Sequence, residues 1–230
     1  MIFYYMKHFS ESFNEWLRLC GNKSSIPGDF VLDQSNYSLF PPDFAIQQNE
    51  QEIMEFIKVL KEKNCESILE IGLGYYGSTH VLFREYFKSV VTIELSLERV
   101  KTFFYKAENF FGKSYFGNGN SKLIVADSNS VLGPKKVLDV LGSSDSEFFD
   151  AIFIDGFHGF ETVLLDFLIY GNFVKKNGVI AFHDVASNIE DSGVPKLMNI
   201  LKNGVLKNLV GDYSEIIYSE YLGIGYFIKK

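Results

Sequence analysis

The sequence predicts an α/β fold in which helices cover both faces of a doubly wound, mostly parallel sheet. Short, almost wholly apolar runs alternate with longer segments of helical periodicity through most of the chain. Strands buried on both faces have this composition, and parallel neighbours need helical crossovers. Five of the runs end at acidic or histidine residues. Because ligands bind beyond the carboxyl ends of parallel strands, we expect these side chains at one rim of the sheet.

The individual elements follow one another regularly after Pro42. Apolar spacings of three and four predict helices over about 45–62, 78–88, 96–111, 134–141 and 160–175, with another beginning near Pro195. Apolar runs predict strands near 66–71, 90–94, 122–126, 149–154 and 178–182. The segments 215–219 and 223–228 are close enough in the chain to pair as a hairpin. The last strand is therefore expected to be antiparallel.

The first part of the chain departs from this alternation. Residues 8–20 have near-helical apolar spacing, and residues 21–42 have the Gly, Pro, Ser, Asn and Asp content of a loop. We divide the chain into an N-terminal helical and loop arm, residues 1–44, and a main domain, residues 45–230. Three interpretations of the arm stay open: a lid, a contact in a homo-oligomer, and an aromatic layer packed on the core.

Composition limits the classes of partner. The 230 residues are 47% hydrophobic, enough for a full core, and carry a net charge of −7. Clustered Lys and Arg, which phosphate binding needs, are missing. The chain shows no apolar run of membrane-spanning length and no secretory signal, and its two cysteines lack metal-ligand spacing. We therefore expect a cytoplasmic protein with a small-molecule partner, reduced thiols, and no nucleic-acid or membrane partner.

The glycine-rich segment 72–78, which follows the first strand of the main domain, indicates a nucleotide-like ligand. Gly72, Gly74 and Gly77 let the backbone turn tightly and approach a ligand, and the next helix offers free N–H groups to a carboxylate or phosphate. Glu94 ends the following strand, where a carboxylate can accept both hydroxyls of a ribose. Together these residues predict an adenosine pocket.

Glu70 distinguishes between the ligands that such a pocket takes. Dinucleotides and S-adenosylmethionine both fit a glycine loop followed by a distant acid. An acid two residues before Gly72 disfavours a pyrophosphate and suits the ammonium group of S-adenosylmethionine. The methyl donor is therefore the favoured ligand. A structural turn in an unrelated α/β protein is the remaining interpretation.

Later polar residues extend this pattern to a family resemblance. They are Glu94, Asp127, the run 149–155 and the pair His183-Asp184. With them, residues 45–230 resemble class I S-adenosylmethionine-dependent methyltransferases, and more narrowly the small O-methyltransferases related to catechol O-methyltransferase. The resemblance implies a seven-stranded sheet with an antiparallel last strand. It also implies methyl transfer to a hydroxyl of a small molecule, such as a sugar or a secondary metabolite.

The donor-binding positions that the resemblance implies are Glu70, Gly72, Gly74, Ser78, Glu94, Asp127 and Ser128. The first four lie where the family holds the methionine end, with the Ser78 hydroxyl meeting its carboxylate. Glu94 matches the acid that binds the ribose. The last two lie where the family contacts adenine, with Asp127 accepting from the exocyclic amine. A turn or helix-capping role is the alternative for Asp127.

The resemblance further implies a metal site at Asp155, His183 and Asp184. Catechol-type enzymes bind Mg²⁺ through an acid after the fourth strand and an acid-amide pair after the fifth, where this chain has His-Asp. Imidazole suits Mn²⁺ better than Mg²⁺, so the cation, Mg²⁺ or Mn²⁺, stays open. The alternative is that the two aspartates hold the ion and His183 lies behind them. Such an ion would lower the pKa of an acceptor hydroxyl.

His158 occupies the place of the catalytic lysine of the catechol-type enzymes, three residues after Asp155. With Asp155 it forms the predicted catalytic pair, in which the imidazole removes the hydroxyl proton. The alternatives are a helix-start role for His158 and a packed position under the sheet rim for His183. His8 and His80 have no link to the rim in sequence, and we expect no functional role for them.

Three rival functions stay open. The first is an NAD-dependent oxidoreductase, which Glu70 disfavours. The second is a non-haem iron oxygenase on the same scaffold, with His158, His183 and an acid as ligands. The third is a methyltransferase-like domain that binds the donor or a partner without catalysis.

Overall fold

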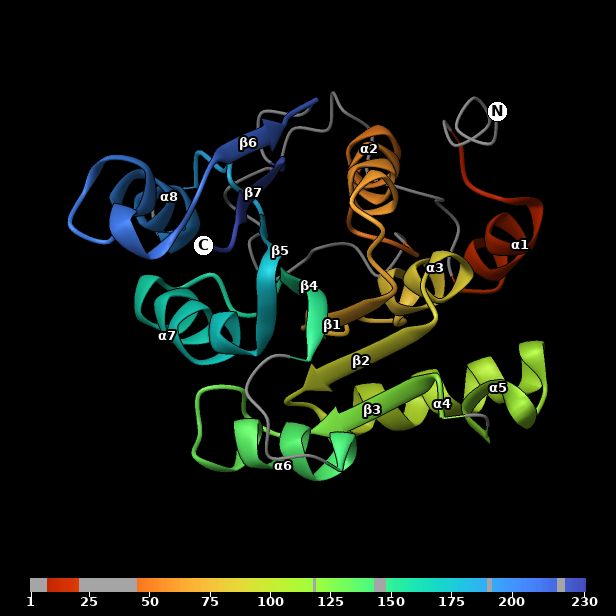
Figure 1. Ribbon diagram of the computed structural model, residues 1–230. Helices are drawn as coiled ribbons and strands as arrows, with labels where there is room; N and C mark the ends of the chain where they lie inside the picture. The colour runs from red at the N-terminus through yellow and green to blue at the C-terminus, as the bar shows by residue number, and fades with distance from the viewer. Residues whose placement is uncertain (1–7, 21–44, 118, 143–147, 190–191, 219–221) are drawn as a thin grey trace.

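A seven-stranded sheet with the strand order β3-β2-β1-β4-β5-β7-β6 forms the centre of the molecule (Figure 1). The computed structural model describes residues 8–20, 45–117, 119–142, 148–189, 192–218 and 222–230. The strands are β1 Ser67–Ile71, β2 Ser89–Glu94, β3 Ser121–Val125, β4 Phe149–Ile154, β5 Val174–His183, β6 Tyr213–Ile216 and β7 Ile224–Ile228. The helices are α1 Glu11–Cys20, α2 Glu50–Glu62, α3 Ser78–Tyr86, α4 Leu97–Phe111, α5 Ser114–Gly117, α6 Leu132–Leu141, α7 Phe160–Tyr170 and α8 Gly193–Asn203.

The pairing of the strands confirms the predicted fold class. Strands β1 to β5 pair in parallel, with Leu69 of β1 beside Val91 of β2 and Ile152 of β4. Strand β7 runs antiparallel to both β5 and β6. The carboxyl ends of the parallel strands therefore meet at one edge, as the sequence predicted.

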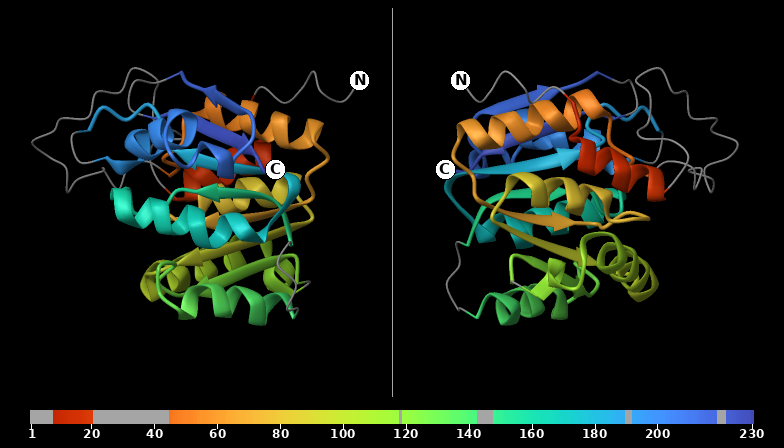
Figure 2. Two further views of the ribbon diagram at one scale, coloured as in Figure 1. Left: turned by 60° about the vertical axis from the view of Figure 1, so that its left-hand side comes forward. Right: turned by 90° about the vertical axis from the view of Figure 1, so that its right-hand side faces the viewer.

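Alternate residues of each strand enter one of two hydrophobic layers. Ile68 and Val90 belong to the layer under α1 to α4, whereas their neighbours Leu69 and Val91 belong to the layer under α6 to α8. Figure 2 shows these two sets of helices on opposite sides of the sheet. Because helices cover both faces of the central strands, the sequences of these strands are almost continuously apolar.

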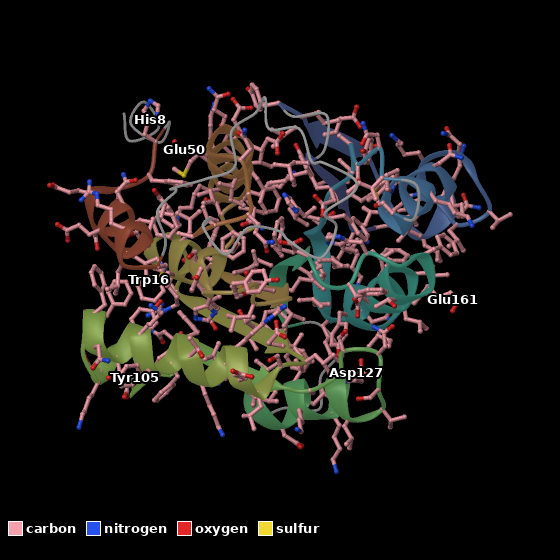
Figure 3. All side chains as sticks on the ribbon, turned by 180° about the vertical axis from the view of Figure 1, so that it is seen from behind. His8, Trp16, Glu50, Tyr105, Asp127 and Glu161 are labelled. Carbon is pink, nitrogen blue, oxygen red and sulfur yellow. The ribbon has the colours of Figure 1, made fainter. Side chains whose placement is uncertain are left out.

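Helix α1 packs on the core. Trp16 is fully buried, lies 5.6 Å from the ring of Phe111, and donates its indole N–H to the hydroxyl of Ser78 (Figure 3). This packing agrees with the third interpretation of the arm for residues 8–20. Residues 1–7 and 21–44 lie outside the described residues, so the predicted domain boundary stays a prediction.

Two predicted helices are shorter than expected. The helix predicted over 45–62 begins at Glu50, because the Asn49 side chain accepts from the N–H groups of Gln51 and Glu52 and caps the first turn. The helix predicted to reach residue 175 ends at Tyr170, and a 3₁₀ turn leads directly into β5. Residues 45–49 are thereby free to cross the edge of the sheet.

Within the described residues, no helix combines the length and apolarity needed to cross a membrane. Cys20 and Cys65 are both buried and unpaired with one another, and burial raises the pKa of each thiol. These thiols are therefore protonated and unreactive at neutral pH.

Candidate active site

Three adjoining cavities lie at the carboxyl ends of the parallel strands, with volumes of about 380, 330 and 30 Å³. The predicted site residues that line them are Gly72, Gly74, Ser78, Glu94, Asp127, Ser128, Asp155, His158, His183 and Asp184. Asp155, directly after β4, lines all three. The structure therefore brings side chains from separate segments to one place, and Asp155 lies where the cavities join.

The glycine loop between β1 and α3 runs directly against the end of β4. Gly72 has a φ of +97°, and a Cβ atom there would lie 2.1 Å from the carbonyl oxygen of Asp155. Gly77 has a φ of +65°, and its Cβ would lie 2.6 Å from the ring of Phe103. A larger residue at Gly72 would therefore push the loop away from Asp155, and one at Gly77 would push it away from Phe103.

Ser78 begins α3, but its hydroxyl is occupied within the protein. The hydroxyl accepts from the indole N–H of Trp16 and donates its own O–H to the carbonyl of Ala45 at 2.5 Å. The helix cap, Gly77, makes no side-chain cap bond, so the first N–H groups of α3 need another acceptor. These N–H groups offer a site for the donor carboxylate beside the hydroxyl that the sequence favoured.

Glu94 is held in a fixed orientation at the wall of the 380 Å³ cavity. One carboxylate oxygen accepts from the N–H of Leu73 at 2.9 Å, and the other accepts from the N–H of Ser96 at 2.8 Å. Each oxygen keeps a lone pair for a ribose hydroxyl. Arg99, which the sequence analysis missed, lies 3.9 Å from Glu94 and over the ring of Tyr75.

Asp127 and Ser128 line the same cavity at the end of β3, where Figure 3 labels Asp127. Asp127 also accepts from the N–H of Asn129 at 2.9 Å, so it has the turn role given as the alternative. Behind this turn lies Asp166 of α7, a buried acid that accepts from the Asn129 amide at 2.6 Å. Nothing in the sequence indicated a role for Asp166, because this residue lies on the inner face of a strongly apolar helix.

Glu70 belongs to a buried polar chain and is not among the described residues that line the three cavities. It accepts from the hydroxyl of Thr92, which contacts Nδ1 of His80, while Nε2 of His80 contacts the hydroxyl of Ser121. Burial raises the pKa of Glu70 well above its ordinary value and lowers that of His80 to about 3. His80 is therefore a neutral core residue connected to Glu70 through Thr92, a connection that nothing in the sequence indicated.

Asp155, His158 and Asp184 form a group that can hold a divalent cation. One ligand atom from each lies within 4.8 Å of the others. Nε2 of His158 is 3.0 Å from Oδ2 of Asp184 and 3.6 Å from Oδ1 of Asp155, and this buried nitrogen has no hydrogen-bond partner among the described residues. Two carboxylates with an imidazole suit Mn²⁺ or a similar ion.

His183, the third predicted cation ligand, is not among the three residues of this group. Its Nδ1 lies 3.2 Å from Oδ1 of Asp155 and 3.3 Å from Oδ1 of Asp184, and the side chain is 3% exposed. His183 therefore contacts both carboxylates, and its predicted role as a cation ligand stays a prediction. Although burial alone lowers the pKa of His183, the carboxylates of Asp184 and Asp155 raise it well above its ordinary value.

A comparison with protein families decides the class of the protein. The family model described as "Methyltransferase domain" matches residues 69–185, from the strand before the glycine loop to the pair His183-Asp184. The chain belongs to this methyltransferase family. Its predicted enzyme class, a methyltransferase, is thereby confirmed.

Solved structures confirm the fold of this methyltransferase. The methyltransferase PaMTH1 of Podospora anserina, crystallised with S-adenosylhomocysteine, has a TM-score of 0.62 and 16% identity over 97% of this chain and 89% of its own. An O-methyltransferase of Bacillus cereus in complex with S-adenosylhomocysteine has a TM-score of 0.57 and 17% identity over 96% and 92%. No curated protein matches the sequence.

Gln48 also lies at the site of the methyltransferase, and the sequence did not indicate it. Gln48 donates its side-chain N–H to Oδ2 of Asp155 at 2.5 Å and accepts from the hydroxyl of Thr79 at 2.6 Å. Residues 45–49 precede α2, and residues 45–48 line the small cavity. Their apolar spacing resembles that of a helix, so the sequence predicted a helix there. The one available signal was Asn49, a preferred helix cap, which places Gln48 outside the helix.

Proposed function

We propose that this methyltransferase transfers the methyl group of S-adenosylmethionine to a hydroxyl of a small molecule, and that a divalent cation held by Asp155 and Asp184 assists. The observation that carries the proposal is the position of Asp155. This one residue lines the cavities on the donor side and also belongs to the cation-holding group beside the 330 Å³ cavity. A methyl donor and a cation-bound oxygen can meet there.

The donor is proposed to extend along the rim from Asp127 to the start of α3. Glu94 accepts from the ribose hydroxyls, and Asp127 with Ser128 contacts the adenine. The methionine carboxylate meets the N–H groups of the first turn of α3. Asp127 and Ser128 line the 380 Å³ cavity, and the start of α3 lines the 30 Å³ cavity. The fixed carboxylate of Glu94, between these two ends, supports the assignment.

The 330 Å³ cavity suits a small acceptor. Phe157 and Leu222 give it apolar walls, and His158, Asp184 and Ser192 supply a few polar groups. Small-molecule sites have this mixture of apolar walls and sparse polar groups. A structure of MycE methyltransferase, with a TM-score of 0.52 and 14% identity over 76% of this chain and 48% of its own, contains Mg, S-adenosylhomocysteine and mycinamycin VI.

His158 is proposed to accept the proton of the acceptor hydroxyl at Nε2. Although burial alone lowers its pKa, the nearby carboxylate of Asp184 raises it, so the imidazolium formed by proton transfer is stabilised. A bound cation would lower the pKa of the acceptor hydroxyl. Asp155 and Asp184 would hold it, and the glycine loop would hold the donor in line with the oxygen.

The test is transfer of a labelled methyl group to a panel of catechols, sugars and amines with added Mn²⁺. The proposal predicts labelled O-methyl products and loss of transfer in the Asp155→Ala, Asp184→Ala double variant. Labelling of amines alone, or full turnover by the double variant, would contradict it. S-adenosylhomocysteine binding without any transfer would favour the non-catalytic rival.

A second candidate, the iron oxygenase, needs His158 and His183 as joint ligands. His183 directs Nδ1 at the two carboxylates instead. The geometry therefore gives that rival little support. Strict dependence of turnover on Fe²⁺ and O₂ would restore it.

A further inference from the structure

We propose that Gln48 is a positioning residue of this site, because its side chain fixes Asp155 and ties it to the helix that follows the donor loop. The inference rests on the proposed function, in which Asp155 holds a divalent cation. Gln48 is 2% exposed and lines the small cavity together with Asp155. It lies far from Asp155 in sequence, so the fold alone brings the two side chains together.

The contacts of Gln48 define the orientation of its amide. The Thr79 hydroxyl donates to the amide oxygen at 2.6 Å, and the amide nitrogen donates to Oδ2 of Asp155 at 2.5 Å. A donor facing a carboxylate makes a strong, charge-assisted hydrogen bond. With the amide reversed, its oxygen would face the Asp155 anion, so the carboxylate selects this orientation and the Thr79 hydroxyl adds a second hydrogen bond to it.

The bond from Gln48 determines which way the Asp155 carboxylate points. Oδ2 is taken by the amide, and Oδ1 faces Nδ1 of His183 at 3.2 Å and Nε2 of His158 at 3.6 Å. Rotation of the carboxylate would break contacts on both sides. Oδ1 is therefore the oxygen directed toward the cation-holding group.

The backbone around Gln48 is fixed as well. Its neighbour Asn49 caps α2, which sets the chain direction at this point. Thr79 lies in the first turn of α3, directly after the donor loop. The amide thus connects the donor helix, the start of α2 and the end of β4. Glutamine suits this place better than its two nearest relatives, since glutamate would face Asp155 with a second anion and asparagine is one methylene shorter.

Calorimetric titration of Mn²⁺ into the wild type and the Gln48→Met variant tests the proposal. Methionine keeps the length of the side chain and removes both hydrogen bonds. Loss of a residue that orients a metal ligand weakens metal binding about 10- to 100-fold, and we expect the Kd for Mn²⁺ to rise by this factor. Gln51→Met, the same change at an exposed position of α2, is the matched control and should keep the wild-type Kd.

Titration of S-adenosylhomocysteine into the same proteins separates the possible failures. If the wild type binds neither ligand, the proposed function fails together with the inference. If the wild type binds both and Gln48→Met binds Mn²⁺ equally well, only the inference is overturned.

If Gln48→Met does not fold, the Thr79→Val variant tests the inference in its place. It removes only the hydroxyl that holds the amide oxygen in place, and should raise the Kd for Mn²⁺ about threefold. An unchanged Kd in that variant overturns the inference.

Discussion

The Asp155 carboxylate is charged despite its position inside the rim. Burial alone would raise its pKa, but His183 and His158 lower it to about 2. The carboxylate is therefore an anion across the physiological pH range. A fixed anion beside two imidazoles stabilises a proton that is transferred to either of them.

Gly72→Ala should destabilise the fold by about 2–4 kcal/mol, from the strained φ and the overlap of Cβ with the Asp155 carbonyl. Urea unfolding measures this cost. Gly117→Ala is the control, because no atom lies within 4 Å of its Cβ position and its φ is ordinary. Equal stability of the two variants would show that the loop does not lie against Asp155.

His158→Ala should lower the rate of methyl transfer about 10²- to 10⁴-fold, the usual effect of losing a general base. The Kd for Mn²⁺, measured by calorimetry, should stay within about threefold of the wild type if the two aspartates hold the ion. His8→Ala, at an exposed histidine, should change neither quantity. A large loss of Mn²⁺ affinity in His158→Ala would instead make His158 a cation ligand.

Among the elements, α7 supports the turn after β3, the proposed adenine end of the site, from behind. Its Asp166 accepts from Asn129, and the hydroxyl of Tyr170 donates to the carbonyl of Ser128 at 2.8 Å. These two contacts fix the turn after β3 that carries Asp127 and Ser128. The shape of the donor cavity therefore depends on a helix that does not line it at these positions.

Asp166 should make the stability of the protein depend on pH. Burial raises its pKa from 3.8 to about 6, so the folded state binds this proton more tightly than the unfolded state. The folded state therefore loses stability as the pH rises from about 4 to about 6, by roughly 2–3 kcal/mol. Asp166→Asn should lack this loss, and urea unfolding at several pH values compares the two proteins. Parallel stability curves would contradict the assignment.

For the whole molecule, the sequence predicted the sheet and its rim better than the details of the site. Apolar runs reveal buried strands because both sheet faces are covered, and polar residues at their ends mark the rim. Side-chain direction at the end of β5 was not predictable. Asp184 has a φ of +59°, which breaks strand alternation and places its carboxylate beside His183. Gln48 was missed because its contacts with Thr79 and Asp155 arise only in the folded chain.

The most direct test of the central claim is a crystal structure with S-adenosylhomocysteine and Mn²⁺ bound, in which the anomalous signal locates the ion. The account predicts Mn²⁺ between Asp155 and Asp184, the ribose on Glu94, and the homocysteine sulfur directed at the cavity that contains His158. An ion bound elsewhere, or a ribose away from Glu94, would contradict it.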